Sequence, residues 1–390
     1  MLKLKLLTPD RRLEDYTVRN APLDVASGAA QAGNASRIAY SAVHIVADPL
    51  ADNDPWLDAA IDWDRIIAFR RYVWSLGLGV AEAMDTAQRG MGVDWDTALE
   101  LIRRSIDAAR DMPGALIASG VGTDHLPADG RITISDVIDA YEEQIEAVEA
   151  LGGRIVLMAS RALTKAARGA EDYLKVYDRI LSQTRQPVII HWLGEMFDPA
   201  LAGYWGSHDH NAAMDTALKV IAANPAKVDG IKISLLSKEK EIAMRRHLPS
   251  GVRMYTGDDF NYAELIAGDG HGYSDALLGI FDAIAPAAAS ALAKLSSGDE
   301  AGFHAVLAPT VPLSRHIFKA PTRFYKTGVV FLAYLNGHQD HFIMVGGQQS
   351  ARSLLHLCDL FRLADAARVL RDPDVAADRM RLTLAAAGLS

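Results

Sequence analysis

A single lysine lies near the end of the strand-like run Val228-Asp-Gly-Ile-Lys-Ile-Ser234. Burying a charged amine is costly, so a lysine inside a strand favours its neutral form. A neutral amine is the nucleophile that attacks a ketone or aldehyde to form a Schiff base. The local pattern also fits an ammonium group that reaches solvent at the strand end. The chemistry of Lys232 therefore depends on what the rest of the chain places around it.

Neighbouring strand-like segments also end in side chains that could take part in chemistry. The run Pro187-Val-Ile-Ile-His-Trp192 brings His191 to a strand end, and an imidazole can relay protons near neutral pH. We therefore predict Lys232 and His191 as the catalytic residues. We expect residues at the other strand ends to contact the substrate, namely Asp48, Asp85, Thr86, Trp192, Asp258, His271 and Ser274.

The elements that must position these residues alternate between strand-like and helix-like segments from Ile38 to Leu278. Repeated strand–helix units indicate a parallel sheet, and eight of them indicate a closed (β/α)8 TIM barrel, whose active site lies at the carboxyl ends of the strands. An open doubly wound sheet would carry a glycine-rich loop after its first strand, where this chain has Asp48-Pro49. The strands are expected at residues 38–47, 78–84, 116–118, 155–159, 187–191, 228–234, 253–256 and 272–278.

The same patterns divide the chain into three parts. Residues 1–37 are polar and irregular, and we expect an N-terminal extension with at most one hairpin. Residues 38–286 form the predicted barrel. Residues 287–390 show helical patterns without strands between them, which predicts a C-terminal helical subdomain packed on the barrel.

Composition limits the class of protein. Half of the 390 residues are hydrophobic and the net charge is −9, as in an ordinary acidic globular protein. No basic stripe with interleaved aromatics is present, so we expect no nucleic-acid partner. No apolar run approaches a membrane span and no signal-peptide pattern is present, so we expect no membrane association and a cytoplasmic location. One cysteine excludes a disulfide framework and a cysteine-rich metal site.

The lysine strand and its neighbours resemble the dihydrodipicolinate synthase and N-acetylneuraminate lyase superfamily. Its members carry Gly-Ile-Lys at the end of the sixth barrel strand and Gly-x-Asp on the next, matched here by Gly230-Ile-Lys232 and Gly257-Asp-Asp259. The resemblance implies a class I lyase or aldolase with Lys232 as Schiff-base nucleophile, no cofactor, and a homo-oligomer, either a dimer or a tetramer. Further short matches occur in order at Ala47-Asp-Pro49, Ile61-Asp-Trp-Asp64, Ala118-Ser-Gly-Val-Gly-Thr123, Asp269-Gly-His-Gly-Tyr-Ser-Asp275 and Pro286.

The chain departs from this family at two strand ends. A loop of the Gly-Thr-Thr-Gly-Glu type, which holds the carboxylate of a 2-keto acid, is replaced by Ala83-Met-Asp-Thr-Ala-Gln-Arg89. Asp85 would repel a substrate carboxylate. The family's proton-relaying tyrosine is replaced by His191. We therefore predict a sugar-derived ketone or aldehyde as substrate rather than pyruvate.

Two other functions fit the sequence. Glu82, His191 and His210 could form the metal site of a metal-dependent TIM-barrel isomerase or lyase, and His208 lies beside His210 in a His-x-His pair. A polar loop is the simpler interpretation of that pair. The barrel could also be a non-catalytic metabolite-binding protein, although such a protein has little need of a buried primary amine at position 232.

Overall fold

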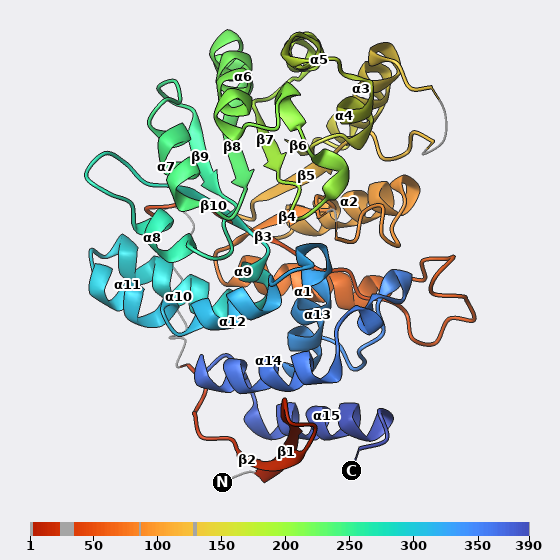
Figure 1. The fold of residues 1–390 in the computed structure, drawn as a ribbon, viewed down its shortest axis with the longest axis vertical. Coiled ribbons are helices and arrows are strands. Elements are labelled where there is room, and N and C mark those ends of the chain that lie inside the picture. The colour runs from red at the N-terminus through yellow and green to blue at the C-terminus, as the bar shows by residue number, and fades with distance from the viewer. Residues whose placement is uncertain (1–2, 24–34, 86, 128–130, 390) are drawn as a thin grey trace.

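The computed structural model describes residues 3–23, 35–85, 87–127 and 131–389. Eight parallel strands form a closed barrel in which strands follow one another in sequence order and the last pairs with the first (Figure 1). The predicted (β/α)8 TIM barrel is therefore confirmed. Its strands are β3 (Ala39–Ala42), β4 (Gly79–Glu82), β5 (Ile117–Val121), β6 (Arg154–Leu157), β7 (Val188–Leu193), β8 (Val228–Ser234), β9 (Arg253–Thr256) and β10 (Asp275–Leu278).

Helices follow the strands and cover the outside of the barrel (Figure 1). Asp94 caps α2, and its carboxylate accepts a hydrogen bond from the Thr97 amide at 2.9 Å. At α3 the residue type of Ser135 also suits a cap, but the cap is Thr133, two residues earlier, which forms a reciprocal capping box with Asp136. These helices are α1 (Trp63–Ser75), α2 (Trp95–Arg110), α3 (Ile134–Ala150), α4 (Arg161–Ala166), α5 (Ala170–Gln183), α6 (His210–Ala223), α7 (Lys238–Arg245), α8 (Tyr262–Ala267) and α9 (Ile280–Ala283).

Large side chains fill the amino-terminal end of the barrel. A Cβ atom at Gly230 would lie 2.7 Å from the ring of Tyr255, so the ring rests on that glycine. The Tyr255 hydroxyl donates to Asp229, at the start of β8, at 2.6 Å. Tyr40 lies in the same way against Gly79, the first residue of β4. The barrel interior is thus a packed core rather than a pore at this end.

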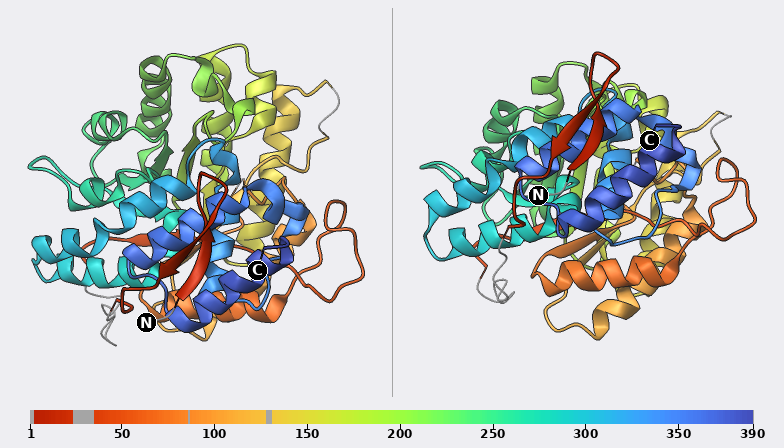
Figure 2. Two further views of the ribbon diagram at one scale, coloured as in Figure 1. Left: turned by 60° about the horizontal axis from the view of Figure 1, so that its bottom comes forward. Right: turned by 90° about the horizontal axis from the view of Figure 1, so that it is seen from below.

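The C-terminal part of the chain is helical and packs beside the barrel (Figure 1). An antiparallel hairpin of β1 (Lys3–Leu7) and β2 (Leu13–Thr17) lies across its last two helices (Figure 2). The Tyr16 hydroxyl donates to Asp365 at 2.6 Å, which ties the hairpin to this region. The helices of the C-terminal part are α10 (Ala285–Ser296), α11 (Glu300–Leu307), α12 (Thr310–Ile317), α13 (Tyr325–Leu335), α14 (Leu354–Ala366) and α15 (Pro373–Ala386). Short 3-10 helices are η1 (Pro199–Leu201), η2 (Tyr204–Gly206), η3 (Pro225–Lys227), η4 (Thr322–Phe324) and η5 (Val345–Ala351).

Helix α13 is the central element of this helical part, and every one of its residues is buried. It contacts α9, α12, α14, α15 and η5. The apolar run of residues 329–335 could by sequence alone have formed an interface between subunits. The structure uses these side chains inside one chain instead. Within the described ranges, the structure contains no helix with the length and apolar character that a membrane span requires.

Candidate active site

Lys232 projects from β8 into the barrel. Its register partners on the neighbouring strands are His191 of β7 and Tyr255 of β9, and Tyr255 belongs to the interior cluster. Only 7% of Lys232 is exposed. Burial lowers the pKa of the Lys232 amine to about 8, against the opposing effect of the Asp259 and Asp85 charges. About a tenth of this amine is therefore neutral, and nucleophilic, at pH 7, far more than for an ordinary lysine.

His191 lies beside Lys232 on the same side of the sheet. Its Nε2 shares a 3.1 Å hydrogen bond with the hydroxyl of Ser234. Within the described part of the chain, nothing hydrogen-bonds the buried Nδ1. Burial, reinforced by the charge of Lys232, holds the pKa of His191 well below its usual range. The imidazole is therefore neutral at pH 7 and can accept a proton.

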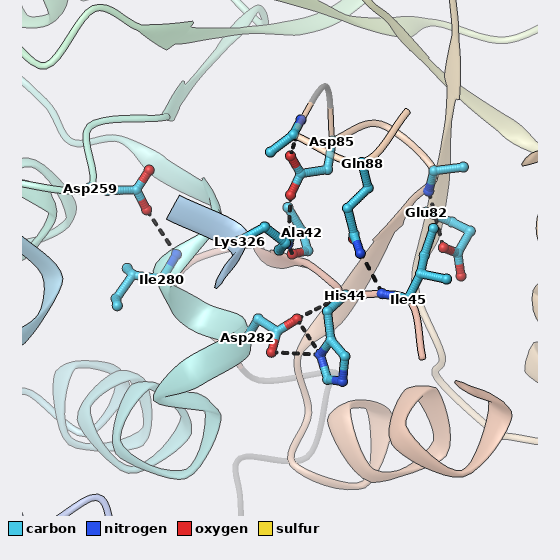
Figure 3. Close-up of polar contacts among 12 residues, drawn as sticks. Ala42, His44, Ile45, Glu82, Asp85, Gln88, Asp259, Ile280, Asp282 and Lys326 are labelled. Atoms are coloured by element: carbon cyan, nitrogen blue, oxygen red, sulfur yellow. Dashed lines mark hydrogen bonds and ion pairs between the residues drawn. The ribbon is translucent and has the colours of Figure 1, made fainter. Parts of the chain in front are cut away.

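Asp259 is the acidic partner of Lys232. It follows β9, is almost fully buried, and accepts a 2.8 Å hydrogen bond from the Ile280 amide (Figure 3). Burial raises the pKa of Asp259 to about 7, although the Ile280 amide and the charge of Lys232 act in the opposite direction. The two groups thus titrate in neighbouring ranges, and the charge of each one affects the protonation of the other.

Asp85, a predicted substrate contact, is also buried at the carboxyl end of the barrel, but it is already paired. Its Oδ2 lies 2.5 Å from the Nζ of Lys326, which comes from α13 (Figure 3). The same Nζ donates to the carbonyl of Ala42, the last residue of β3, at 2.8 Å. Lys326 is fully buried. Two lysines and two carboxyl groups therefore meet where the strands end.

Asp258 occupies a different position from the one predicted. Its Oδ1 accepts from the amides of Phe260 and Asn261, and its Oδ2 accepts from the Asn261 side chain at 2.8 Å. These bonds engage both carboxylate oxygens in the turn after β9. The carboxylate that interacts with Lys232 belongs to Asp259 instead. Thr86, the next predicted contact, lies outside the described residues.

His271 and Ser274 lie at the wrong end of the barrel for substrate contact. Strand β10 begins at Asp275, so both residues precede it and belong to its amino end. His271 is exposed in a turn, and the Ser274 hydroxyl donates to Glu241 at 2.7 Å. The prediction that they bind substrate is therefore corrected, because the expected strand at 272–278 started three residues too early.

Asp48 and Trp192 also point away from Lys232. The Asp48 carboxylate accepts from the Leu50 amide at 2.9 Å in a turn beyond β3. Trp192 follows the inward-facing His191 on β7, so its side chain points to the outer face of the strand. There its indole packs edge-on against Trp205, with ring centroids 6.4 Å apart. Trp192 is thus part of the helical layer and does not form a wall for a sugar ring.

The alternative metal site does not assemble. Glu82 faces the helices and forms a bidentate pair with Arg70, with both N–O distances at 2.9 Å. His210 shares hydrogen bonds with Glu195 and Lys240 outside the barrel. In the ranges that the structure covers, no group of three metal-binding side chains comes together. Glu82, His191 and His210 are therefore not a ligand set.

A family model described as "Protein of unknown function (DUF993)" matches residues 4–389, almost the whole chain. The chain belongs to the DUF993 family. None of the curated proteins matches its sequence.

Solved structures of dihydrodipicolinate synthases share the barrel fold of this DUF993 chain, as the sequence resemblance predicted. The enzyme from Thermotoga maritima gives a TM-score of 0.62 at 15% identity, covering 86% of this chain and 99% of that chain. A chloride-inhibited enzyme from Acinetobacter baumannii, complexed with pyruvate, gives 0.62 at 17% identity, covering 85% and 99%. The enzyme from Aquifex aeolicus gives 0.61 at 9% identity, covering 90% and 98%. At these identities the similarity establishes the fold.

A second feature of the rim of the DUF993 barrel is a cavity of about 250 Å³ at the carboxyl ends of β5 and β6. Its wall includes Thr123 and Ser160, whose hydroxyl oxygens lie 2.6 Å apart. Arg161 and Asp198 form an ion pair of 2.5 Å at its edge. The cavity therefore offers hydrogen-bonding groups on the same rim as the Lys232 amine.

The buried Arg70–Glu82 pair gives the DUF993 protein a testable structural requirement. We expect Arg70→Met to lower the free energy of unfolding by about 3–5 kcal/mol, because Glu82 would stay buried without its cation. Chemical denaturation measures this change. The matched control is Arg71→Met, since Arg71 is exposed and pairs with the exposed Asp111 at 3.4 Å. That change should stay within about 0.5 kcal/mol, and equal losses in both variants would contradict the structural assignment.

Two residues of this centre were missed by sequence reasoning. Asp259 stood in the quoted Gly257-Asp-Asp259 match, and the alignment of that match with Gly-x-Asp singled it out over Asp258. Lys326 carried a weaker signal, as the one charged residue of the apolar helix Tyr325–Leu335. A charge at such a position requires a buried partner, but the pattern does not name that partner.

Proposed function

We propose that this DUF993 protein is a class I lyase that forms a Schiff base between Lys232 and a small carbonyl compound. One observation carries the proposal: the Lys232 amine is buried inside the barrel, at the carboxyl ends of the strands, where burial lowers its pKa to about 8 and the charge of Asp259 acts on it. A buried amine tuned in this way is suited to nucleophilic attack and is an unfavourable choice for structure alone. The fold shared with dihydrodipicolinate synthases supports the same class of reaction.

The steps follow from the groups present. The Lys232 amine adds to the carbonyl carbon, and the carbonyl oxygen leaves as water after taking up two protons. Asp259 can accept a proton from the ammonium form of Lys232 and return it to the departing oxygen. The resulting iminium ion withdraws electrons from the neighbouring carbon, which permits carbon–carbon cleavage, condensation or dehydration. Neutral His191 is placed to remove a proton from the bound substrate.

The charges around Lys232 favour a neutral, hydroxyl-rich substrate, such as a sugar-derived ketone or aldehyde, over pyruvate. Asp85 and Asp259 are the acidic groups whose charges act on this amine, and the cation Lys326 is already paired with Asp85. Lys326 would have to leave Asp85 to serve as the counter-ion of a substrate carboxylate. The unpaired Nδ1 of His191 and the hydroxyl groups of the rim cavity suit hydrogen bonds to substrate hydroxyls.

Reductive trapping tests this function. We expect cyanoborohydride together with a keto-sugar or sugar aldehyde to add the mass of the reduced adduct to the chain, and peptide mapping to locate it at Lys232. Pyruvate should label Lys232 more slowly at equal concentration. The Lys232→Ala variant is the control, because it retains the exposed lysines that react without a site. Adducts spread over exposed lysines, with none at position 232, would contradict the proposal.

Assembly and location complete the proposed function. Since α13 is buried within one chain, the proposal of a homo-oligomer, either a dimer or a tetramer, rests on the family resemblance alone. A cytoplasmic location is likewise a proposal. The expected partner is the small carbonyl substrate, without nucleic acid or membrane.

A further inference from the structure

One buried charge has no role in the steps above, and it comes from outside the barrel. Lys326 lies on α13, among side chains that are all buried. Its ammonium group spans from the Ala42 carbonyl, at 2.8 Å, to the Asp85 carboxylate, at 2.5 Å (Figure 3). These two acceptors lie at the ends of neighbouring barrel strands, because β3 pairs with β4.

A structural link between α13 and the barrel does not require this pair. Removing two charges from water is expensive, and a buried ion pair often stabilises a protein no more than apolar residues of similar volume would. Apolar packing already joins α13 to its neighbours, as in the stacked rings of Tyr325 and Phe318 at 4.3 Å. The buried pair of Lys326 and Asp85, at the same end of the barrel as the buried Lys232, therefore indicates a functional role rather than a purely structural one.

Asp85 is held firmly in its place. Its Oδ1 accepts from the Ala87 amide at 3.0 Å while its Oδ2 faces Lys326. Asp85 also acts on Lys232, since the charge of Asp85 raises the pKa of that lysine and the charge of Lys326 lowers it. The charges that act on Lys232 thus come from three places: Asp259 after β9, Asp85 after β4 and Lys326 on α13.

We propose that Lys326 is a positioning residue of the Schiff-base site, which fixes Asp85 at the end of the barrel that holds Lys232 and offsets the negative charge of Asp85, so that α13 contributes to the reaction centre. This inference rests on the proposed function for its catalytic meaning. The predicted electrostatic effect can be tested without that function, because it concerns only the basicity of the Lys232 amine. Without Lys326, an uncompensated Asp85 would hold Lys232 in the ammonium form, which cannot attack a carbonyl.

The test measures the basicity of Lys232 directly. Formaldehyde with cyanoborohydride methylates neutral amines, is small enough to need no binding site, and can be followed at each lysine by peptide mass spectrometry. In the wild-type protein, labelling of Lys232 should rise with pH through a midpoint of about 8. In Lys326→Met the midpoint should move upward by about one pH unit or more, because a cation is lost and an anion is freed.

Four further variants make the result specific. Asp85→Asn should lower the midpoint, and Lys326→Met combined with Asp85→Asn should return it to within about half a unit of wild type, because opposite charges are removed together. Lys326→Arg keeps the cation and should keep the midpoint. Lys319→Met, at an exposed lysine of the same helical region, is the matched control and should leave the midpoint unchanged.

The outcomes separate this inference from the proposed function. If Lys326→Met proves unable to fold, Asp85→Asn and the charge-neutral double variant still report the opposite shift and its cancellation. A folded Lys326→Met protein with an unchanged midpoint at Lys232 would overturn the inference. Midpoints that shift as expected, in a protein that traps no carbonyl substrate at Lys232, would support the coupling and contradict the lyase.

Discussion

Lys232→Ala is expected to reduce kcat by at least about a thousandfold with the carbonyl compound that trapping identifies, because the covalent route is lost. Lys232→Arg should fail to the same extent, since a guanidinium keeps the charge but supplies no nucleophilic amine. The wild-type rate should increase as pH rises through about 8, where Lys232 loses its proton. Steady-state kinetics across this range measures both effects.

The matched control for this loss is Lys294→Ala, which removes an amine that pairs with Asp299 on the surface at 3.2 Å. It should retain the wild-type rate. Circular dichroism and thermal melting establish that each variant is folded. Wild-type kcat in a folded Lys232→Ala protein would show that no imine is formed, whatever the fold resembles.

Asp259→Asn is expected to lower kcat by about a hundredfold to ten-thousandfold, the range for loss of a general acid–base group. The carboxyl that takes the proton from Lys232 and returns it to the departing oxygen would be absent. The same substitution removes the negative charge that raises the pKa of Lys232. Methylation of Lys232 at neutral pH should therefore become faster while turnover becomes slower.

This opposed response distinguishes a chemical role from damage to the structure, which would not make one buried amine selectively more reactive. Asp258→Asn is the matched control, because Asp258 is a neighbouring carboxyl whose acceptors are engaged in the turn. Its effect on kcat should stay below about tenfold. A larger loss in Asp258→Asn than in Asp259→Asn would exchange the roles assigned to the two residues.

Local periodicity was sufficient to predict the barrel and the inward position of Lys232. The alternation of strand-like and helical segments is a property of consecutive residues, and so is the β-branched run around the lysine. Strand boundaries were less secure. Asp269 and Gly272 close a turn before β10 whose sequence resembles the start of a strand. The prediction therefore began this strand too early and assigned His271 to the wrong end of the barrel.

The wrong assignment of Trp192 to the substrate site could have been avoided from the sequence. His191 and Trp192 are consecutive on one strand, so only one of them can face the interior. The position of Lys326 could not be predicted in this way. Its partners Ala42 and Asp85 are more than 200 positions away, and only the packing of α13 against the barrel brings them together.

Tyr40 and Tyr255 fill the amino-terminal end of the barrel. For a reaction with two substrates, this filling has a consequence for the order in which they would bind. Because one end of the barrel is filled, a compound bound to Lys232 can enter and leave only past the opposite rim. The carbonyl compound that forms the imine would thus bind first and lie deepest, with a second reactant above it. In a cleavage, the fragment nearest the rim would depart first, and the fragment held on the amine would depart last.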